Sequence, residues 1–338
     1  MKTWQETARV YAEMARLLAA GQRCALATLV RLEGSSYRRP GAKLLIREDG
    51  ALLGNVSGGC LENDLRERAQ AVLRKGVCEL VHYDTGGDEN VVWGLGLGCN
   101  GKLDIFVQPC PPGGDAAVAA DLARRLDGHE AFALRTRLDQ PGQGRISAGP
   151  PGDSPPGIVD DADGQVFVET LEPPADLVVI GAGDDAVPLV RLAAEAGFRV
   201  TLVDHRSAYL RPELFPAARR LVTARPQGGL ADLPSHARTF VVVKNHAIGA
   251  DKEWARLYAA TPAPYIGLLG PKARRDDILA SLPDDARPRA YGPIGLDLGA
   301  EGAEQIALSI VAEALAVHAG RAGGSLRARA APIHGGGR

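Results

Sequence analysis

The chain has 338 residues, enough for two domains that each bury a core. Its 39 Lys and Arg residues nearly balance its 41 Asp and Glu residues, so the net charge is −2 and no global field favours nucleic acid. The apolar runs are strand-sized and fall short of the roughly 20 residues that span a bilayer. The N-terminus lacks the features of a secretory signal, and the five cysteines are spread widely, as is typical of reduced thiols. We therefore expect a cytoplasmic protein that binds no nucleic acid and has no membrane span.

The first half mixes helical and strand patterns. Apolar side chains at helical spacing predict helices over residues 4–18 and 61–75. Short apolar runs bounded by turn residues predict strands at 24–32, 42–47, 52–56, 78–83, 103–108, 131–137 and 165–171. Residues 141–157 are rich in Pro and Gly and predict a mobile surface loop. We assign residues 1–174 to an N-terminal α+β domain.

In the second half, apolar strands alternate with helical patterns. Strands are predicted at 177–180, 199–203, 240–243 and 265–269, and an apolar-striped helix at 304–317. This alternation is typical of a parallel sheet with helices on its faces. It predicts a Rossmann-like domain over residues 175–320 and an α/β fold class for the whole chain. Residues 321–338 are rich in Gly, Ala and Arg, which predicts a disordered tail.

Two cysteines of the first half stand in glycine-rich loops, one being Ser57-Gly58-Gly59-Cys60 and the other containing Gly98 and Cys99. Glycines let the backbone bend tightly and approach a ligand. The first loop precedes a predicted helix, so its amides can cradle a phosphate or lower the pKa of the Cys60 thiol. Arg38 and Arg39 add positive charge on a neighbouring loop. The alternative for Cys60 is a small buried residue in a tight turn.

The second half opens with a strand, a glycine turn and a helix. Gly181 and Gly183 lie in this turn, and Asp204 ends the next strand 21 residues after Gly183. This pattern favours a pyrophosphate at the helix N-terminus and a ribose at Asp204. Asp184 and Asp185 stand where phosphates would lie and would repel them, so a different ligand or a purely structural turn remains open.

A third group of candidate residues follows later strands of the sheet. Lys272 lies three residues after the predicted strand at 265–269, at the edge where open parallel sheets bind ligands. It is placed to hold an anion. The alternative is that it belongs to a solvated first turn of a helix.

Several motifs together resemble the XdhC/CoxI family. In the first half they are residues 33–43, 54–62 and 94–99, and in the second half residues 180–183, 265–275 and 293–300. The resemblance covers nearly the whole chain in the right order. It implies an accessory factor for xanthine dehydrogenase-type molybdenum hydroxylases, which binds molybdenum cofactor, supports its sulfuration and inserts it into the apoenzyme.

The resemblance and the residue chemistry point to one binding mode. The cofactor, in its mononucleotide or cytidine dinucleotide form, carries phosphate and a metal centre with soft ligands. We expect the thiolates of Cys60 and Cys99 to contact molybdenum or its sulfur ligand, and Arg38, Arg39 and Lys272 to hold phosphate. The implied partners are an apo molybdenum hydroxylase, a cysteine desulfurase, a cofactor nucleotidyltransferase and a second copy of the chain in a homodimer.

Two other functions remain open from the sequence. The first is an NAD(P)-dependent oxidoreductase, with Gly181, Gly183 and Asp204 on the cofactor and Lys244 or His246 as acid or base. The second is an adaptor that docks a hydroxylase or a sulfurtransferase without binding cofactor. An adaptor predicts that neither cysteine loop matters for cofactor retention.

Overall fold

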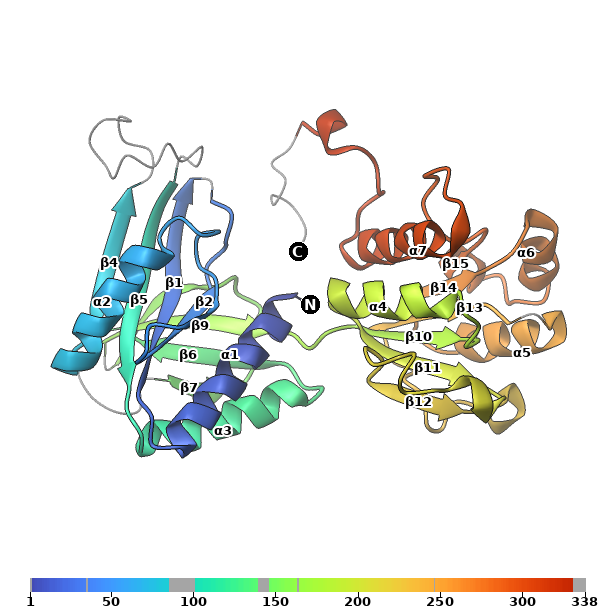
Figure 1. Ribbon diagram of the computed structural model, residues 1–338. Helices are drawn as coiled ribbons and strands as arrows, with labels where there is room; N and C mark the ends of the chain where they lie inside the picture. Colours follow the sequence, from blue (N-terminus) through green and yellow to red (C-terminus); the bar gives the residue numbers. More distant parts are fainter. Residues whose placement is uncertain are drawn as a thin grey trace. The chain divides into compact units, whose positions relative to one another are not determined.

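The computed structural model describes residues 2–34, 36–84, 101–138, 146–162, 164–245 and 247–330. The chain forms two compact units, Met1–Pro173 and Pro174–Arg338 (Figure 1). The predicted α/β class is confirmed, because antiparallel sheets with helices make up the first unit and a parallel sheet with helices makes up the second. In the described ranges, every helix is too short or too polar to cross a membrane.

A five-stranded antiparallel sheet, in the order β3-β2-β1-β5-β4, forms the centre of the first unit. Its strands are β1 (Cys24–Gly34), β2 (Lys43–Arg47), β3 (Leu52–Gly54), β4 (Glu79–Asp84) and β5 (Gly101–Cys110). Because neighbouring residues of a strand point to opposite faces, Ala25 and Ala27 pack with α2 (Glu62–Lys75). Cys24 and Leu26 pack with α1 (Lys2–Ala19) on the other face. Helices thus bury both faces.

A smaller antiparallel sheet, in the order β7-β6-β9-β8, completes the first unit. Its strands are β6 (Phe132–Arg137), β7 (Ile146–Gly149), β8 (Gly157–Asp161) and β9 (Gly164–Leu171). Helix α1 packs beside α3 (Gly114–Asp127), and the Trp4 indole Nε1 donates a 2.8 Å hydrogen bond to the Leu126 carbonyl. A buried ion pair between Lys43 of β2 and Glu169 of β9 joins the two sheets.

The second unit is built on a six-stranded parallel sheet in the order β12-β11-β10-β13-β14-β15. The strands are β10 (Asp176–Ile180), β11 (Arg199–Asp204), β12 (Arg220–Thr223), β13 (Thr239–Val243), β14 (Tyr265–Leu268) and β15 (Ala290–Tyr291). Strands β11 and β12 extend the sheet to one side of β10, and β13 begins the other side. The strand order therefore reverses between β10 and β13, which is where open α/β sheets bind ligands.

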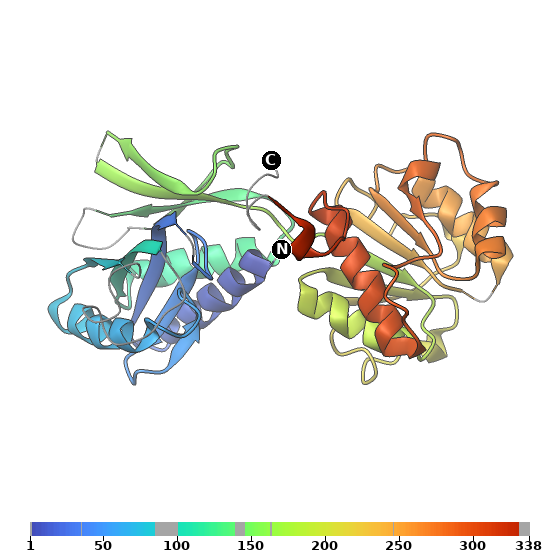
Figure 2. The ribbon, with the colours of Figure 1, turned by 90° about the horizontal axis from the view of Figure 1, so that it is seen from above.

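Helices cover this parallel sheet. They are α4 (Ala186–Ala196), α5 (Ile248–Ala259), α6 (Lys272–Leu279) and α7 (Gly302–His318). Trp254 of α5 and Ile278 of α6 belong to one apolar cluster with the sheet, while α4 and α7 lie side by side (Figures 1 and 2). Strand β10 is buried along its whole length, as expected for a strand with helices on both faces.

Two sequence expectations are wrong in part. The predicted loop at 141–157 contains strand β7, which pairs with β6 and buries Ile146; residues 139–145 lie outside the described residues. The predicted disordered tail contains a 3₁₀ turn at Leu326–Ala328, and a Cβ on Gly323 would lie 2.8 Å from a Leu296 methyl. The tail is therefore ordered as far as this turn and contacts the unit at Gly323, although residues 322–328 are exposed. Residues 331–338 lie outside the described residues. Helix α3 has no predicted counterpart.

Candidate functional site

The loop between β3 and α2 presents Cys60. Gly58 and Gly59 adopt φ angles of +93° and +115°, which side chains larger than hydrogen rarely allow. The Cys60 side chain is exposed. The two glycines therefore turn the chain so that the thiol faces solvent instead of the core.

The carboxylate of Glu62, in the first turn of α2, holds this loop together. It accepts hydrogen bonds from the amides of Val56, Ser57 and Leu61 at 3.2, 3.1 and 3.1 Å, and from the Ser57 hydroxyl. Burial raises the pKa of Glu62, but the hydrogen bonds from Ser57 and Val56 outweigh it, so the pKa lies below its ordinary value. The loop's own carboxylate therefore already occupies most of the predicted phosphate cradle.

The tip of the loop keeps groups that can meet a ligand. The Gly58 amide donates to the Asn55 side chain at 2.7 Å, but in the described contacts the amides of Gly59 and Cys60 donate to no protein group. The Tyr37 ring lies over the tip, because a Cβ on Gly58 would be 3.1 Å from it, and the ring is 73% exposed. An exposed thiol, two amides and an aromatic ring thus gather at one place.

Three basic residues of the segment 38–43, which follows Tyr37, differ in their interaction partners. Arg38 forms an ion pair with Glu6 of α1. Lys43 is buried against Glu169 and donates to the Gly41 carbonyl at 2.9 Å. Arg39 is exposed and has no charged partner among the described residues. Arg39 is therefore the cation of this segment that is open to an anion, while Gly98 and Cys99 lie outside the described residues.

The glycine turn after β10 is filled by the protein itself. The Gly181 amide donates to the Val203 carbonyl at 2.8 Å, and a Cβ on Gly181 would lie 2.7 Å from the Lys244 carbonyl oxygen. The Asp185 carboxylate lies against the turn, only 2.8 Å from where a Cβ of Gly183 would be. Lys244, whose side chain is 4% exposed, donates to Asp185 at 2.7 Å and to the Gly181 carbonyl at 3.2 Å. These glycines therefore allow close internal packing.

Asp204, at the end of β11, is also engaged by the protein. Its carboxylate is fully buried and accepts hydrogen bonds from the Ala182 amide at 2.9 Å and from the Arg206 amide at 2.8 Å. The Arg206 guanidinium adds two more at 3.0 and 2.9 Å. Burial raises the pKa of Asp204, but the hydrogen bonds from Arg206 and Ala182 prevail and lower it to about 2. A ribose at Asp204 would have to displace Arg206.

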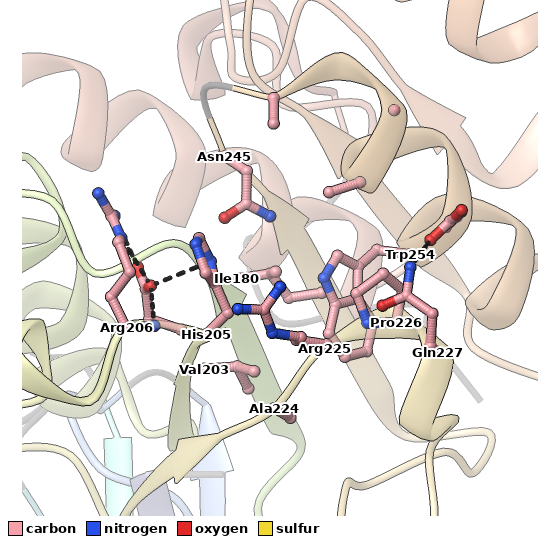
Figure 3. A pocket seen from close by; sticks show the side chains of 15 residues that line it. Ile180, Val203, His205, Arg206, Ala224, Arg225, Pro226, Gln227, Asn245 and Trp254 are labelled. Carbon is pink, nitrogen blue, oxygen red and sulfur yellow. Dashed lines mark hydrogen bonds and ion pairs between the residues drawn. The ribbon is translucent and has the colours of Figure 1, made fainter.

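A pocket of about 470 Å³ opens beyond the ends of β11, β12 and β13 (Figure 3). Its floor is apolar and includes Ile180, Val203, Ala224 and Trp254. Its polar lining is Asp204, which is paired with Arg206, together with His205, Arg206, Arg225, Gln227, Asn245 and Glu253. Lys272 does not line it and is exposed at the start of α6, and His246 lies outside the described residues.

Sequence reasoning missed Glu62, the Asp185–Lys244 pair and Arg225. Glu62 had a local signal, because acids in the first turn of a helix cap its free amides. Arg225 had a weaker one, since it follows a strand on the ligand-binding edge. Among the described residues, no group of three or more His, Cys, Asp or Glu side chains could hold a metal ion.

Known proteins resemble this chain over most of its length. Residues 177–314 match the XdhC Rossmann domain, and residues 17–84 match the XdhC and CoxI family. A Bacillus subtilis protein named as a probable xanthine dehydrogenase subunit is 32% identical, covering 88% of this chain and 94% of its own. The Escherichia coli molybdenum cofactor insertion chaperone PaoD is 25% identical, covering 89% of this chain and 85% of its own. The crystal structure of a Bacillus halodurans protein described as a xanthine dehydrogenase is 28% identical, with a TM-score of 0.77 and coverage of 92% and 96%.

Proposed function

Because the chain belongs to the XdhC and CoxI family, we propose that it is an accessory factor in the maturation of a xanthine dehydrogenase-type molybdenum hydroxylase. It binds molybdenum cofactor as cargo and delivers it to the apoenzyme. The names of the relatives support this role, one being a molybdenum cofactor insertion chaperone and another a probable xanthine dehydrogenase subunit. The single observation that carries the proposal is the exposed Cys60 thiol on a loop whose base is hydrogen-bonded to Glu62.

The groups around Cys60 fit such a cargo. A thiolate is a soft donor that suits molybdenum or its terminal sulfur. The amides of Gly59 and Cys60 can donate hydrogen bonds to a phosphate, and the Tyr37 ring offers a flat apolar face to a pterin. We assign a further phosphate contact to Arg39, which is exposed two residues after Tyr37. Arg38 contributes less, because Glu6 already neutralises it. Cys99 and Gly98 remain in the proposal as a second thiol loop.

The finer steps extend this role. The bound cofactor is held while a cysteine desulfurase supplies its terminal sulfur, and a cofactor nucleotidyltransferase supplies the cytidine dinucleotide form where the client needs it. Two copies of the chain act as a homodimer. Each of these steps needs direct docking of a partner, since an oxidation-sensitive cofactor is best passed on without release to solvent.

The oxidoreductase alternative receives less support. It needs Asp204 on a ribose and Lys244 as acid or base. Asp204 is bound by Arg206 and Ala182, and Lys244 is bound by Asp185 and Gly181. Neither side chain is open to a substrate in this arrangement.

The test is reconstitution of an apo molybdenum hydroxylase under anaerobic conditions. Apoenzyme is mixed with isolated molybdenum cofactor, with and without the full chain, and hydroxylase activity is followed over time. We expect the chain to raise the yield of active enzyme, and Cys60→Ser to lower that gain, while Cys78→Ser keeps it. Equal activation with and without the chain, at every ratio of cofactor to apoenzyme, would contradict the proposed role.

A further inference from the structure

The parallel sheet of the second unit ends in a pocket whose residues take no part in the proposed role of the Cys60 loop. We propose that this pocket binds a phosphorylated nucleoside, with the base on the apolar floor and the phosphate at Arg225. This site does not depend on the proposed delivery of molybdenum cofactor. Four features indicate it: the place of the pocket, its floor, its free cation and the closure of the neighbouring glycine turn.

The pocket lies where this type of sheet binds nucleotides. Residues that follow β11, β12 and β13 line it, next to the point where the strand order reverses. Ligands of open α/β sheets bind beyond the carboxyl ends of the strands at this point. The volume of about 470 Å³ lies in the range of small-molecule sites.

The floor suits a flat ring. Val203 is the second-last residue of β11, Ala224 follows β12, and Trp254 of α5 is 2% exposed. Gln227 and Glu253, which share a 2.7 Å hydrogen bond, also line the pocket with polar groups that can meet the edge of a base. An apolar floor with a few polar groups at its rim is the usual character of such sites.

The charge available to a phosphate comes from Arg225. Arg206 is paired with Asp204 and stacks on the Tyr209 ring at 3.8 Å, so its charge is already balanced. Arg225 has no charged partner among the described residues, and Figure 3 shows it and His205 projecting into the pocket from the ends of two strands. His205 and Arg225 also line an adjoining pocket of about 420 Å³. A phosphate placed between the two pockets would meet the Arg225 guanidinium while the base of the same ligand stays on the apolar floor.

The glycine turn disfavours the usual dinucleotide arrangement, because Asp185 lies against it. A dinucleotide places its pyrophosphate on such a turn. Here the Gly181 and Ala182 amides donate to Val203 and Asp204. The carboxylate of Asp185, held by Lys244, lies against the turn and takes up space that an anion would need. We therefore expect the ligand to be a phosphorylated nucleoside, with no gain in affinity from a second nucleotide.

The experiment is titration calorimetry on the full chain, comparing adenosine with 5′-AMP and 2′-AMP, and cytidine with CMP. We expect at least one monophosphate to bind about tenfold more tightly than its nucleoside, since an arginine–phosphate bond of this kind is worth roughly that factor. Arg225→Ala should reduce this ratio to near one. Arg220→Ala, which removes the same charge at the opposite end of β12, should leave the ratio unchanged.

A second variant tests the floor. Ala224→Phe should weaken the nucleoside and the monophosphate alike, because it fills the space for the base while leaving Arg225 in place. Three results would overturn the proposal: no monophosphate binds the wild type, Arg225→Ala keeps the full ratio, or NAD⁺ binds about tenfold more tightly than AMP. The last would place a pyrophosphate on the glycine turn.

Discussion

The Cys60 loop and the glycine turn after β10 look alike in sequence but differ in what they leave open. Each is a glycine-rich bend before a helix, and each has a carboxylate of its own chain against the bend, Glu62 in one and Asp185 in the other. Glu62 binds the base of its loop, so the tip with Cys60 stays exposed. Asp185, held by Lys244, lies on the turn itself. The position of the acid decides whether a glycine loop presents a ligand site or fills it.

Among these substitutions, Asp185→Ala is expected to lower the free energy of unfolding the most. It leaves the ammonium of Lys244, which is 4% exposed, without its half-exposed counterion, and a buried charge left unpaired costs about 3 kcal/mol of unfolding free energy. Denaturant unfolding measures it. Asp184→Ala, at the exposed neighbouring position, should change stability by less than about 0.5 kcal/mol. If both variants behave alike, the acid does not fill the turn. Combining Asp185→Ala with Lys244→Met should recover part of the loss.

Glu62→Gln tests whether the Glu62 carboxylate holds the Cys60 loop. The amide keeps the shape of the side chain but loses the charge and half of the accepting capacity, so we expect a loss of about 2 kcal/mol and faster hydrogen exchange at the Val56, Ser57 and Leu61 amides. The control is Glu67→Gln, on the exposed side of α2. Unchanged exchange at these amides would mean that the loop does not depend on the carboxylate.

The pH dependence of the unfolding free energy tests whether Arg206 engages Asp204. Its folded pKa of about 2 lies below the ordinary value, so the unfolded chain binds the proton more readily and the stabilisation is complete only above the unfolded pKa. Stability should fall as the pH is lowered from about 4 towards 2. Asp204→Asn should therefore be less stable than the wild type at neutral pH, and this difference should shrink in acid. A constant difference from pH 7 to pH 2 would contradict the engagement of Asp204 by Arg206.

Gly59→Ala is expected to lower the free energy of unfolding the least. No atom stands within 4 Å of the added Cβ, so the cost comes from the φ of +115° alone and should be about 1 kcal/mol. The rate of Cys60 alkylation should change as the backbone adjusts. Gly152→Ala, which also meets open space but at ordinary φ, should be neutral in both measurements. Equal behaviour of the two variants would show that the loop does not need glycine at residue 59.

The spacing of apolar residues was enough to predict most elements of the fold, because a helix or strand that buries one face repeats apolar side chains at a fixed interval. It failed for β7, whose four residues sit among prolines and glycines, and for α3. The site was predicted less well. Cys60 and the glycine turn were visible as local patterns, but the pairing of Arg38 with Glu6 and of Lys43 with Glu169 depends on residues 32 and 126 positions away. No local pattern shows which cation remains available.

The most direct test of the account is anaerobic gel filtration of the chain with isolated molybdenum cofactor, with molybdenum and pterin measured in the protein peak. The wild type and Asp185→Ala should both carry cofactor, because the glycine turn is not its site, and Cys60→Ser should lose most of it while Cys78→Ser retains it. Equal cofactor in the Cys60→Ser and wild-type peaks would contradict the claim that the Cys60 loop holds the cargo.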